Sequence, residues 1–187
     1  MPADYDKAAE YLTQHTGYSF PILKPVSQPR VIRTLTAALR DNLSSQQTNA
    51  GLKIKMFAAA IFSGQVSNTT LTAEIKNMVA HITPGLTDDT FNSLQDIAYI
   101  VIPEDASACK TFLAAMQQQF SLAETEAALL LLAIAASYSP ALINDAVIET
   151  VLKIVEPASI VEIVVWLSVL QLLNRLGNYY AVAVEEH

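Results

Sequence analysis

Cysteine and glycine are scarce in this chain of 187 residues. Cys109 is the single cysteine, which excludes a disulfide within one chain and Cys-x-x-Cys redox chemistry. Only five glycines are present, and alternating β-branched segments are few, which argues against a sheet-rich fold. A lone cysteine of this kind is usually a small buried residue, so we expect Cys109 to be buried rather than nucleophilic.

Basic residues are also few, with 11 Lys and Arg against 18 Asp and Glu, and a formal net charge of -7. This balance argues against nucleic acid as the main partner. From Ser121 onward there are 2 basic and 8 acidic residues. Between Lys24 and Lys55 the sign reverses, and Asp41 is the only acid among Lys24, Arg30, Arg33, Arg40, Lys53 and Lys55. We interpret these residues as solvated helix faces; the alternative is a basic patch that meets an acidic surface on another subunit.

Neither a signal peptide nor a long membrane-spanning run is evident. The chain opens on the charged, amphipathic MPADYDKAAEYL, which lacks the pattern of a signal peptide. Although 52% of the residues are hydrophobic, the runs AALLLLAIAA and IVVWLSVLQLL fall short of the roughly 20 residues that a span requires. We therefore expect a cytoplasmic protein in which both runs are buried core helices.

Helical spacing of Ala, Leu and Ile predicts an all-α protein with a single domain over residues 1–187. The Pro-marked residues 18–28 should follow an N-terminal helix, and Ser121 with Glu124 predicts a capping box. The expected helices are 2–15, 29–45, a helix capped by Asn49 that ends at Gly64, 70–82, 88–102, 105–120 and 121–138. A helix capped by Ser139 should then run from Pro140 to 155, and a long helix should begin at Pro157.

A weak internal repeat is also present. A shift of 72 positions without a gap places Ile75 on Val147, Val79 on Val151 and Leu94 on Trp166. Chance overlap of apolar positions is the alternative explanation. If the repeat is genuine, the domain consists of two related helical halves that bury their apolar faces against each other.

The segment LLLLAIAASYSPALINDAVIETVLKIVEPASIVEIVVWLSVLQLLNRL resembles the helical hairpin of the AhpD-like proteins, which include the carboxymuconolactone decarboxylases. The resemblance covers residues 121–176 best: an Ala-rich helix, a sharp turn, a second helix and a long apolar helix ending in Asn-Arg-Leu. It implies an AhpD-like multi-helix bundle that assembles into homo-oligomers.

The redox chemistry of that family is not expected here. Its peroxidase members carry a Glu on the first helix, a Cys-x-x-Cys at the turn and a His one turn later. The aligned positions hold Ala128 at the Glu, Pro140 and Ile143 at the two Cys, and Val147 at the His. The resemblance therefore implies the fold without its thiol peroxidase activity, because no thiolate or imidazole stands at the turn.

A few polar residues remain as candidates for a site near the turn. The catalytic candidates are Glu126, Asp145 and Arg175, and Tyr138, Ser139 and Asn144 would line a small polar pocket. Capping and turn formation explain the residues near the turn equally well, and Arg175 could simply pair with Glu162 or Glu149. The three histidines are scattered, so we expect no metal site and no cofactor.

The favoured function is therefore a non-catalytic or repurposed AhpD-like helical protein with a binding or structural role. Trp166, Tyr179 and Tyr180 give the last helix more apolar surface than one hairpin covers, so we expect a homo-oligomer, either a dimer, a trimer or a hexamer. The alternatives are a cofactor-free lyase or isomerase of carboxymuconolactone decarboxylase type that uses carboxylate acid–base groups, and an unrelated helical adaptor.

Overall fold

The computed structural model describes residues 2–44, 50–138 and 141–185, with the side chains of the last helix described as far as residue 179. Within these residues the chain is helical and contains no strand, which confirms the all-α prediction. The α-helices are α1 Tyr5–Thr16, α2 Pro29–Leu43, α3 Leu52–Gln65, α4 Thr69–Ile82, α5 Asp88–Asp96, α6 Ala106–Phe120, α7 Glu124–Ser137, α8 Asp145–Ile154 and α9 Pro157–Glu185. Two short 3₁₀ helices, η1 Pro21–Leu23 and η2 Ile97–Tyr99, follow α1 and α5.

Most of the helix starts and stops follow from local signals. Asp4 accepts a hydrogen bond from the Lys7 N–H at the start of α1, and Gly17 ends that helix with φ of 82°. Pro29 and Pro157 stand at the first positions of α2 and α9, where a missing N–H costs nothing. The predicted cap Asn49 lies outside the described residues.

The predicted capping box was wrong in its residues. Ser121 has φ of 51° and ψ of 57° and forms the left-handed C-cap of α6. The N-cap of α7 is Ala123, whose N–H donates to Glu126 Oε2 at 2.8 Å. Glu126 therefore caps α7 from its third position, without a Ser or Thr partner at the N-cap.

Two predicted helices were also too long. The helix expected over 88–102 ends at Asp96 and passes through η2 into an irregular segment before Pro103. The proline explains only why Ile102 is not helical, because the residue before a proline disfavours helical dihedral angles. The helix expected from Pro140 begins only at Asp145. Asn144 is its N-cap, since its side chain accepts from the Val147 N–H at 3.0 Å.

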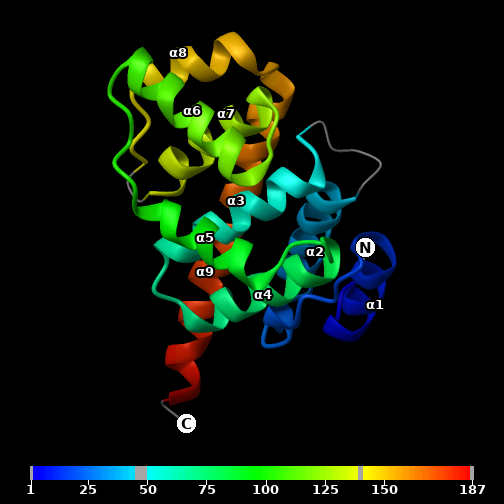
Figure 1. Ribbon diagram of the computed structural model, residues 1–187. Coiled ribbons are helices and arrows are strands. Elements are labelled where there is room, and N and C mark those ends of the chain that lie inside the picture. Colours follow the sequence, from blue (N-terminus) through cyan, green and yellow to red (C-terminus); the bar gives the residue numbers. More distant parts are fainter. Residues whose placement is uncertain (1, 45–49, 139–140, 186–187) are drawn as a thin grey trace.

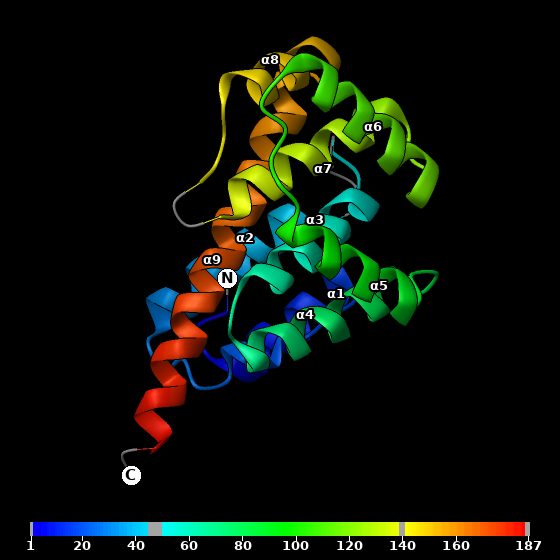
Figure 2. The same cartoon turned by 60° about the vertical axis from the view of Figure 1, so that its left-hand side comes forward.

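Helices α3 and α7 form the centre of the molecule. Residues 54–63 of α3 and 127–135 of α7 are buried, and the two helices pack against each other. Helices α4 and α5 pack on α3, whereas α6 and α8 pack on α7. Figure 1 shows α6, α7 and α8 at one end of the molecule and α1, α2, α4 and α5 at the other. The long helix α9 runs along both groups, and its C-terminal end projects beyond the rest of the chain (Figures 1 and 2).

The helix boundaries agree with two related halves. Adding 72 to the bounds of α3, Leu52–Gln65, gives those of α7, Glu124–Ser137. Each of these central helices packs against the helix that follows it, α4 in one case and α8 in the other. The same shift matches the end of α4 to the end of α8 but not its start, because α8 begins only at Asp145. The correspondence ends at α9, whose 29 residues far exceed the 9 of α5. This extra length carries α9 along both halves.

Candidate functional site

A cleft of about 480 Å³ lies beside the C-terminal end of α7, at the turn where the sequence suggested a site. Its volume is in the range of small-molecule sites. The cleft brings together two of the predicted residues, Tyr138 and Arg175. Its walls come from α3, α7, α9 and the segment after α7: Phe62, Ala136, Ser137, Tyr138, Ala141, Ile143, Val164, Leu167, Ser168, Gln171, Leu172 and Arg175.

The hydroxyl groups of the cleft donate their protons to the backbone. Ser137 Oγ donates to the Ala133 carbonyl at 2.6 Å, and Ser168 Oγ donates to the Val164 carbonyl at 2.8 Å. Tyr138 Oη donates to the Ala98 carbonyl at 2.9 Å and so joins α7 to η2. Arg175 is the only charged residue among the described residues of the lining. The cleft can therefore hold a small apolar molecule with an anionic end, but no carboxylate is at hand to act as a base.

The other predicted residues lie apart from this cleft. Glu126 is engaged at the opposite end of α7, eleven residues from Ser137, or roughly 16 Å at the rise of a helix. Asp145 is exposed at the first position of α8 and does not line the cleft. The structure thus does not bring together the three catalytic candidates Glu126, Asp145 and Arg175.

Asn144 has a structural role in the described residues. Besides capping α8, its Nδ2 donates to the Pro103 carbonyl at 2.9 Å and ties the start of α8 to the segment before α6. It also lines a shallower hollow shared with Tyr99 and Tyr138. Ser139 lies outside the described residues.

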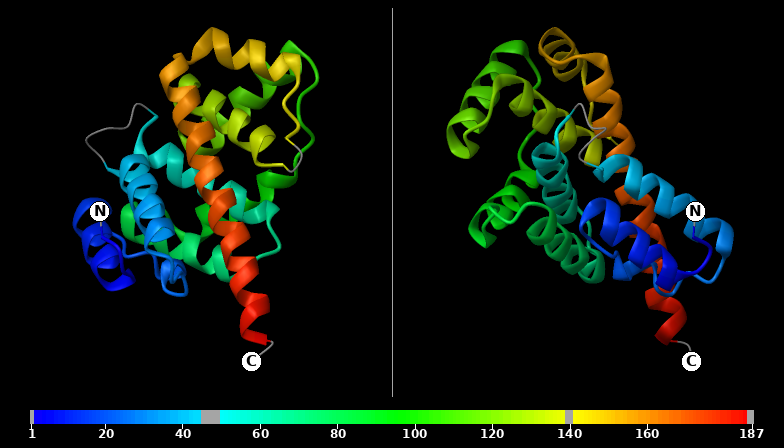
Figure 3. Two further views of the ribbon diagram at one scale, coloured as in Figure 1. Left: turned by 180° about the vertical axis from the view of Figure 1, so that it is seen from behind. Right: turned by 90° about the vertical axis from the view of Figure 1, so that its right-hand side faces the viewer.

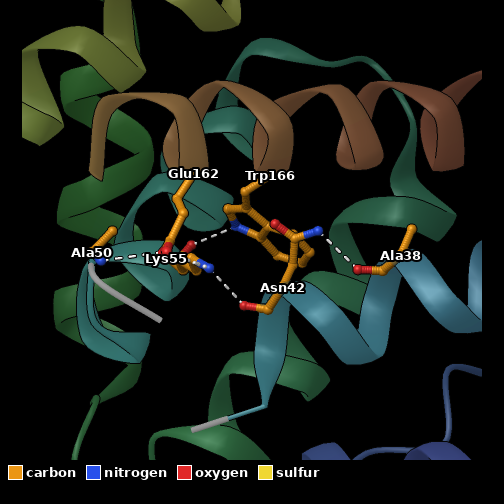
Figure 4. Close-up of polar contacts among 6 residues, drawn as sticks. All are labelled: Ala38, Asn42, Ala50, Lys55, Glu162 and Trp166. Atoms are coloured by element: carbon orange, nitrogen blue, oxygen red, sulfur yellow. Dashed lines mark hydrogen bonds and ion pairs between the residues drawn. The ribbon is translucent and has the colours of Figure 1, made fainter. Parts of the chain in front are cut away.

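The sequence reasoning missed a buried ion pair at the other side of α9. Lys55 Nζ lies 3.2 Å from Glu162 Oε2 and donates to the Asn42 carbonyl at 2.8 Å (Figure 4). The side chain of Lys55 is 1% exposed and that of Glu162 is 20% exposed. Burial lowers the pKa of Lys55 below its usual 10.5, and the Glu162 carboxylate opposes part of this shift.

This ion pair corrects two sequence-based expectations. Lys55 points into the core and is not part of a basic surface patch. Glu162 pairs with Lys55, and Glu149 pairs with Lys153 at 3.3 Å, so neither of the expected pairs with Arg175 forms. The available signal was a lone charge of each sign within an otherwise apolar run, IKMFAAAIF and IVEIVVW.

The ion pair joins three helices and lies outside the cleft. Glu162 Oε2 also accepts from the Ala50 N–H at 3.2 Å, and Trp166 Nε1 donates to the Lys55 carbonyl at 2.8 Å (Figure 4). Neither Lys55 nor Glu162 lines any of the five best-formed cavities of the described residues. Its role is therefore to fix α9 to the end of α2 and the start of α3.

A second buried carboxyl group holds the Pro-marked connection. Burial raises the pKa of Glu74 on α4 above its usual 4.5, while hydrogen bonds from the Ile22 N–H and the Tyr18 hydroxyl partly oppose the shift. Burial also raises the pKa of Tyr18. Glu74 lines none of the five best-formed cavities of the described residues, and its hydrogen bonds hold the Pro-marked connection, so we assign it a structural role.

Metal-binding groups are dispersed. In residues 2–44, 50–138 and 141–185, no three His, Cys, Asp or Glu side chains are placed to hold a metal ion. His15 Nδ1 forms a hydrogen bond with the Tyr11 carbonyl, and His81 Nδ1 forms one with the Asn77 carbonyl, each within its own helix. Cys109 is fully buried, as predicted.

The outer side of α9 is unusually apolar for a surface helix. Val161, Val165 and Leu172 are 60%, 45% and 44% exposed. The segment Pro157–Tyr179 is long and apolar enough to cross a membrane, a criterion that core helices of soluble proteins also meet. Figure 3 shows that α9 lies on the outside of the bundle over much of its length when the molecule is seen from behind.

Comparisons of this chain with protein families, curated proteins and solved structures found no match. The resemblance to the AhpD-like proteins therefore stays a prediction that rests on residues 121–176.

Proposed function

We propose that the protein is a non-catalytic helical interaction protein that works as a homo-oligomer and associates through the outer side of α9. The observation that carries this proposal is the row of exposed valine and leucine side chains on that helix. Contiguous apolar surface on a soluble protein usually marks an interface, because exposing it to water costs free energy of roughly 25 cal/mol per Å².

The dispersal of the candidate acids supports a non-catalytic role. A cofactor-free lyase or isomerase would need a carboxylate beside the substrate, within hydrogen-bond reach of the proton it moves. Glu126 caps α7 and Asp145 begins α8, and neither lines the cleft that contains Arg175. An interaction protein needs no such convergence.

Light scattering with size-exclusion chromatography tests the association. We expect the wild-type chain to form a dimer or larger oligomer at micromolar concentration. Val165→Glu should make it monomeric, because the new carboxylate would have to be desolvated in the interface. Val101→Glu is the matched control, since Val101 is 87% exposed but lies outside α9. A monomeric wild type would refute the proposal.

The cleft favours a second candidate function, binding of a small apolar anion. Its walls are mostly apolar, and Arg175 supplies a positive charge. The fluorescent anion 8-anilinonaphthalene-1-sulfonate is a suitable probe, with octanoate as competitor. Arg175→Met should weaken binding about tenfold, whereas Arg33→Met, on the exposed surface of α2, should not change it. Equal affinities for the two variants would reject this candidate.

A further inference from the structure

Seven exposed residues of α9 are spaced like the contact seam of a coiled coil, and the exposed Val164 lies beside them. Starting from Ala158, exposed positions recur at alternating steps of three and four residues through six steps along the helix. The seam consists of Ala158, Val161, Val165, Ser168, Leu172, Arg175 and Tyr179. A strict three-four alternation gives a narrow strip that follows one neighbouring helix crossing at about 20°. The seam therefore fits a single partner helix better than a broad or irregular surface.

The order of residues along the seam is compatible with pairing to its own copy in the antiparallel direction. If Val165 of one copy lies opposite Ser168 of the other, Val161 lies opposite Leu172 and Ala158 lies opposite Arg175. Ala158, Val165 and Leu172 occupy one contact position of the seven-residue repeat, and Val161, Ser168 and Arg175 occupy the other. Each pair joins a residue of the first position with a residue of the second, as an antiparallel two-helix seam requires. Ser168 is small and lies at the centre, where two helices approach each other most closely.

The charges at the two ends of the seam select this direction. From Pro157 to Asn174 the only charged residue is Glu162, which is turned inward to Lys55. The exposed Glu156 precedes this stretch and the exposed Arg175 follows it. Antiparallel pairing brings Arg175 of one copy to the Glu156 end of the other, twice by symmetry. Parallel pairing would instead place like charges together at each end.

The inner side of α9 argues for a protein partner and against a lipid one. The ion pair of Lys55 with Glu162 and the hydrogen bond from Trp166 hold this side in the core (Figure 4). The helix therefore cannot leave the bundle to cross a membrane without breaking a buried ion pair. The net charge of -7, with Glu156 immediately before α9, also opposes an anionic lipid surface.

We infer that two copies of this chain pair through an antiparallel α9–α9 seam centred between Val165 and Ser168, with Arg175 of each copy facing Glu156 of the other. This inference rests on the proposed function, because it specifies the partner and the geometry of the association. It is an isologous interface, in which the same surface of both copies is buried and growth stops at the dimer.

Pulsed electron spin resonance distances test the direction of pairing. A spin label at Asn178→Cys lies near the end of α9, beside the seam, while the buried Cys109 of the unsubstituted chain should remain unlabelled. In the antiparallel dimer, the two labels should be roughly 36 Å apart: 23 residues of helical rise separate them along the helix axis, and the spacing between the two helices separates them across it. A parallel dimer would place them roughly 10 Å apart. That result would overturn the inference and leave the proposed self-association intact, whereas a monomeric protein would overturn both.

Charge reversal tests the contact between Arg175 and Glu156. Arg175→Glu and Glu156→Arg should each raise the dimer dissociation constant about tenfold, because either change sets like charges opposite each other at two symmetric places. The double variant should return to within about threefold of the wild type. Both residues are exposed, so the fold should tolerate these changes, which circular dichroism checks. Singles with no effect, or a double variant no better than the singles, would refute the contact.

Discussion

Replacement of Glu162 by Gln would leave an uncompensated lysine in the core. The Lys55 side chain is 1% exposed, and its ammonium group would keep only neutral oxygen partners, the Asn42 carbonyl and the new side-chain amide oxygen, in place of the Glu162 carboxylate. Removal of one member of a buried ion pair typically costs about 3–5 kcal/mol, because the remaining charge stays desolvated. We expect Glu162→Gln to lower the free energy of unfolding by about 3 kcal/mol, since the Gln side chain still offers an oxygen to the Ala50 N–H.

The converse change should cost less. Lys55→Met removes the buried charge and keeps a side chain of similar shape. The Glu162 carboxylate retains 20% exposure and the Ala50 N–H, so it can be partly hydrated. We expect a loss of about 1–2 kcal/mol. The double variant Lys55→Met with Glu162→Leu should lie within about 1 kcal/mol of the wild type, because replacement of a whole buried pair by apolar groups is nearly neutral.

Urea denaturation followed by tryptophan fluorescence measures these differences. Trp166 is the only tryptophan, and its indole donates to the Lys55 carbonyl, so it reports on the ion pair itself. The pKa of Lys55 is lower in the folded state than its value of 10.5 in the unfolded state. Between these two pKa values the unfolded state binds more protons than the folded state, so the contribution of Lys55 to stability rises with pH. This rise should be absent in Lys55→Met. Equal losses below 1 kcal/mol in both single variants would refute the description of Lys55 as a desolvated charge.

Three further predictions concern other parts of the molecule. Glu74→Gln should stabilise the protein at pH 7 by on the order of 1 kcal/mol. The pKa of Glu74 is raised in the folded state, so the stability of the wild type falls as the pH rises from 4.5 through the folded pKa. Urea midpoints measured at pH 4 and pH 7 should show this fall in the wild type and not in the variant. Gly64→Ala should cost about 1–3 kcal/mol in thermal unfolding, because a Cβ there would lie 2.8 Å from the Gln95 carbonyl oxygen, while Gly85→Ala, with open space around it, serves as control. Binding of 8-anilinonaphthalene-1-sulfonate should weaken as the protein concentration rises, because Arg175, Ser168 and Leu172 belong both to the cleft and to the α9 seam, which the dimer would cover. An affinity that does not depend on protein concentration would show that one of the two assignments is wrong.

Local signals were sufficient for most of the helices. Pro29, Gly17 and Pro157 each act within one turn of their own position, so their effect on helix boundaries could be predicted without the fold. The prediction failed near Pro140 because two caps competed. Proline can begin a helix, but Asn144 offers a side-chain oxygen to the Val147 N–H and determines where α8 starts.

The candidate site was predicted only in part for a different reason. Residues near a turn, such as Tyr138, stay close to it in the fold, and Arg175 joined them because α9 passes beside α7. Glu126 lies three helical turns from that end of α7, because its place just before the apolar run puts it in the first turn of the helix, away from the turn that follows it.

The sequence by itself determined that the chain is helical, that it buries most of the run AALLLLAIAA and that it holds one cysteine, and hence no Cys-x-x-Cys pair. These properties depend on residue types and on spacings of three and four positions. Only the tertiary structure decided which side of α9 is buried. Ile163, Trp166 and Leu170 face the core, Lys55 neutralises Glu162 there, and the remaining apolar residues stay outside. A helix that is apolar all round carries no periodic signal for its inner side, so the neighbours that α2, α3 and α7 provide must select it.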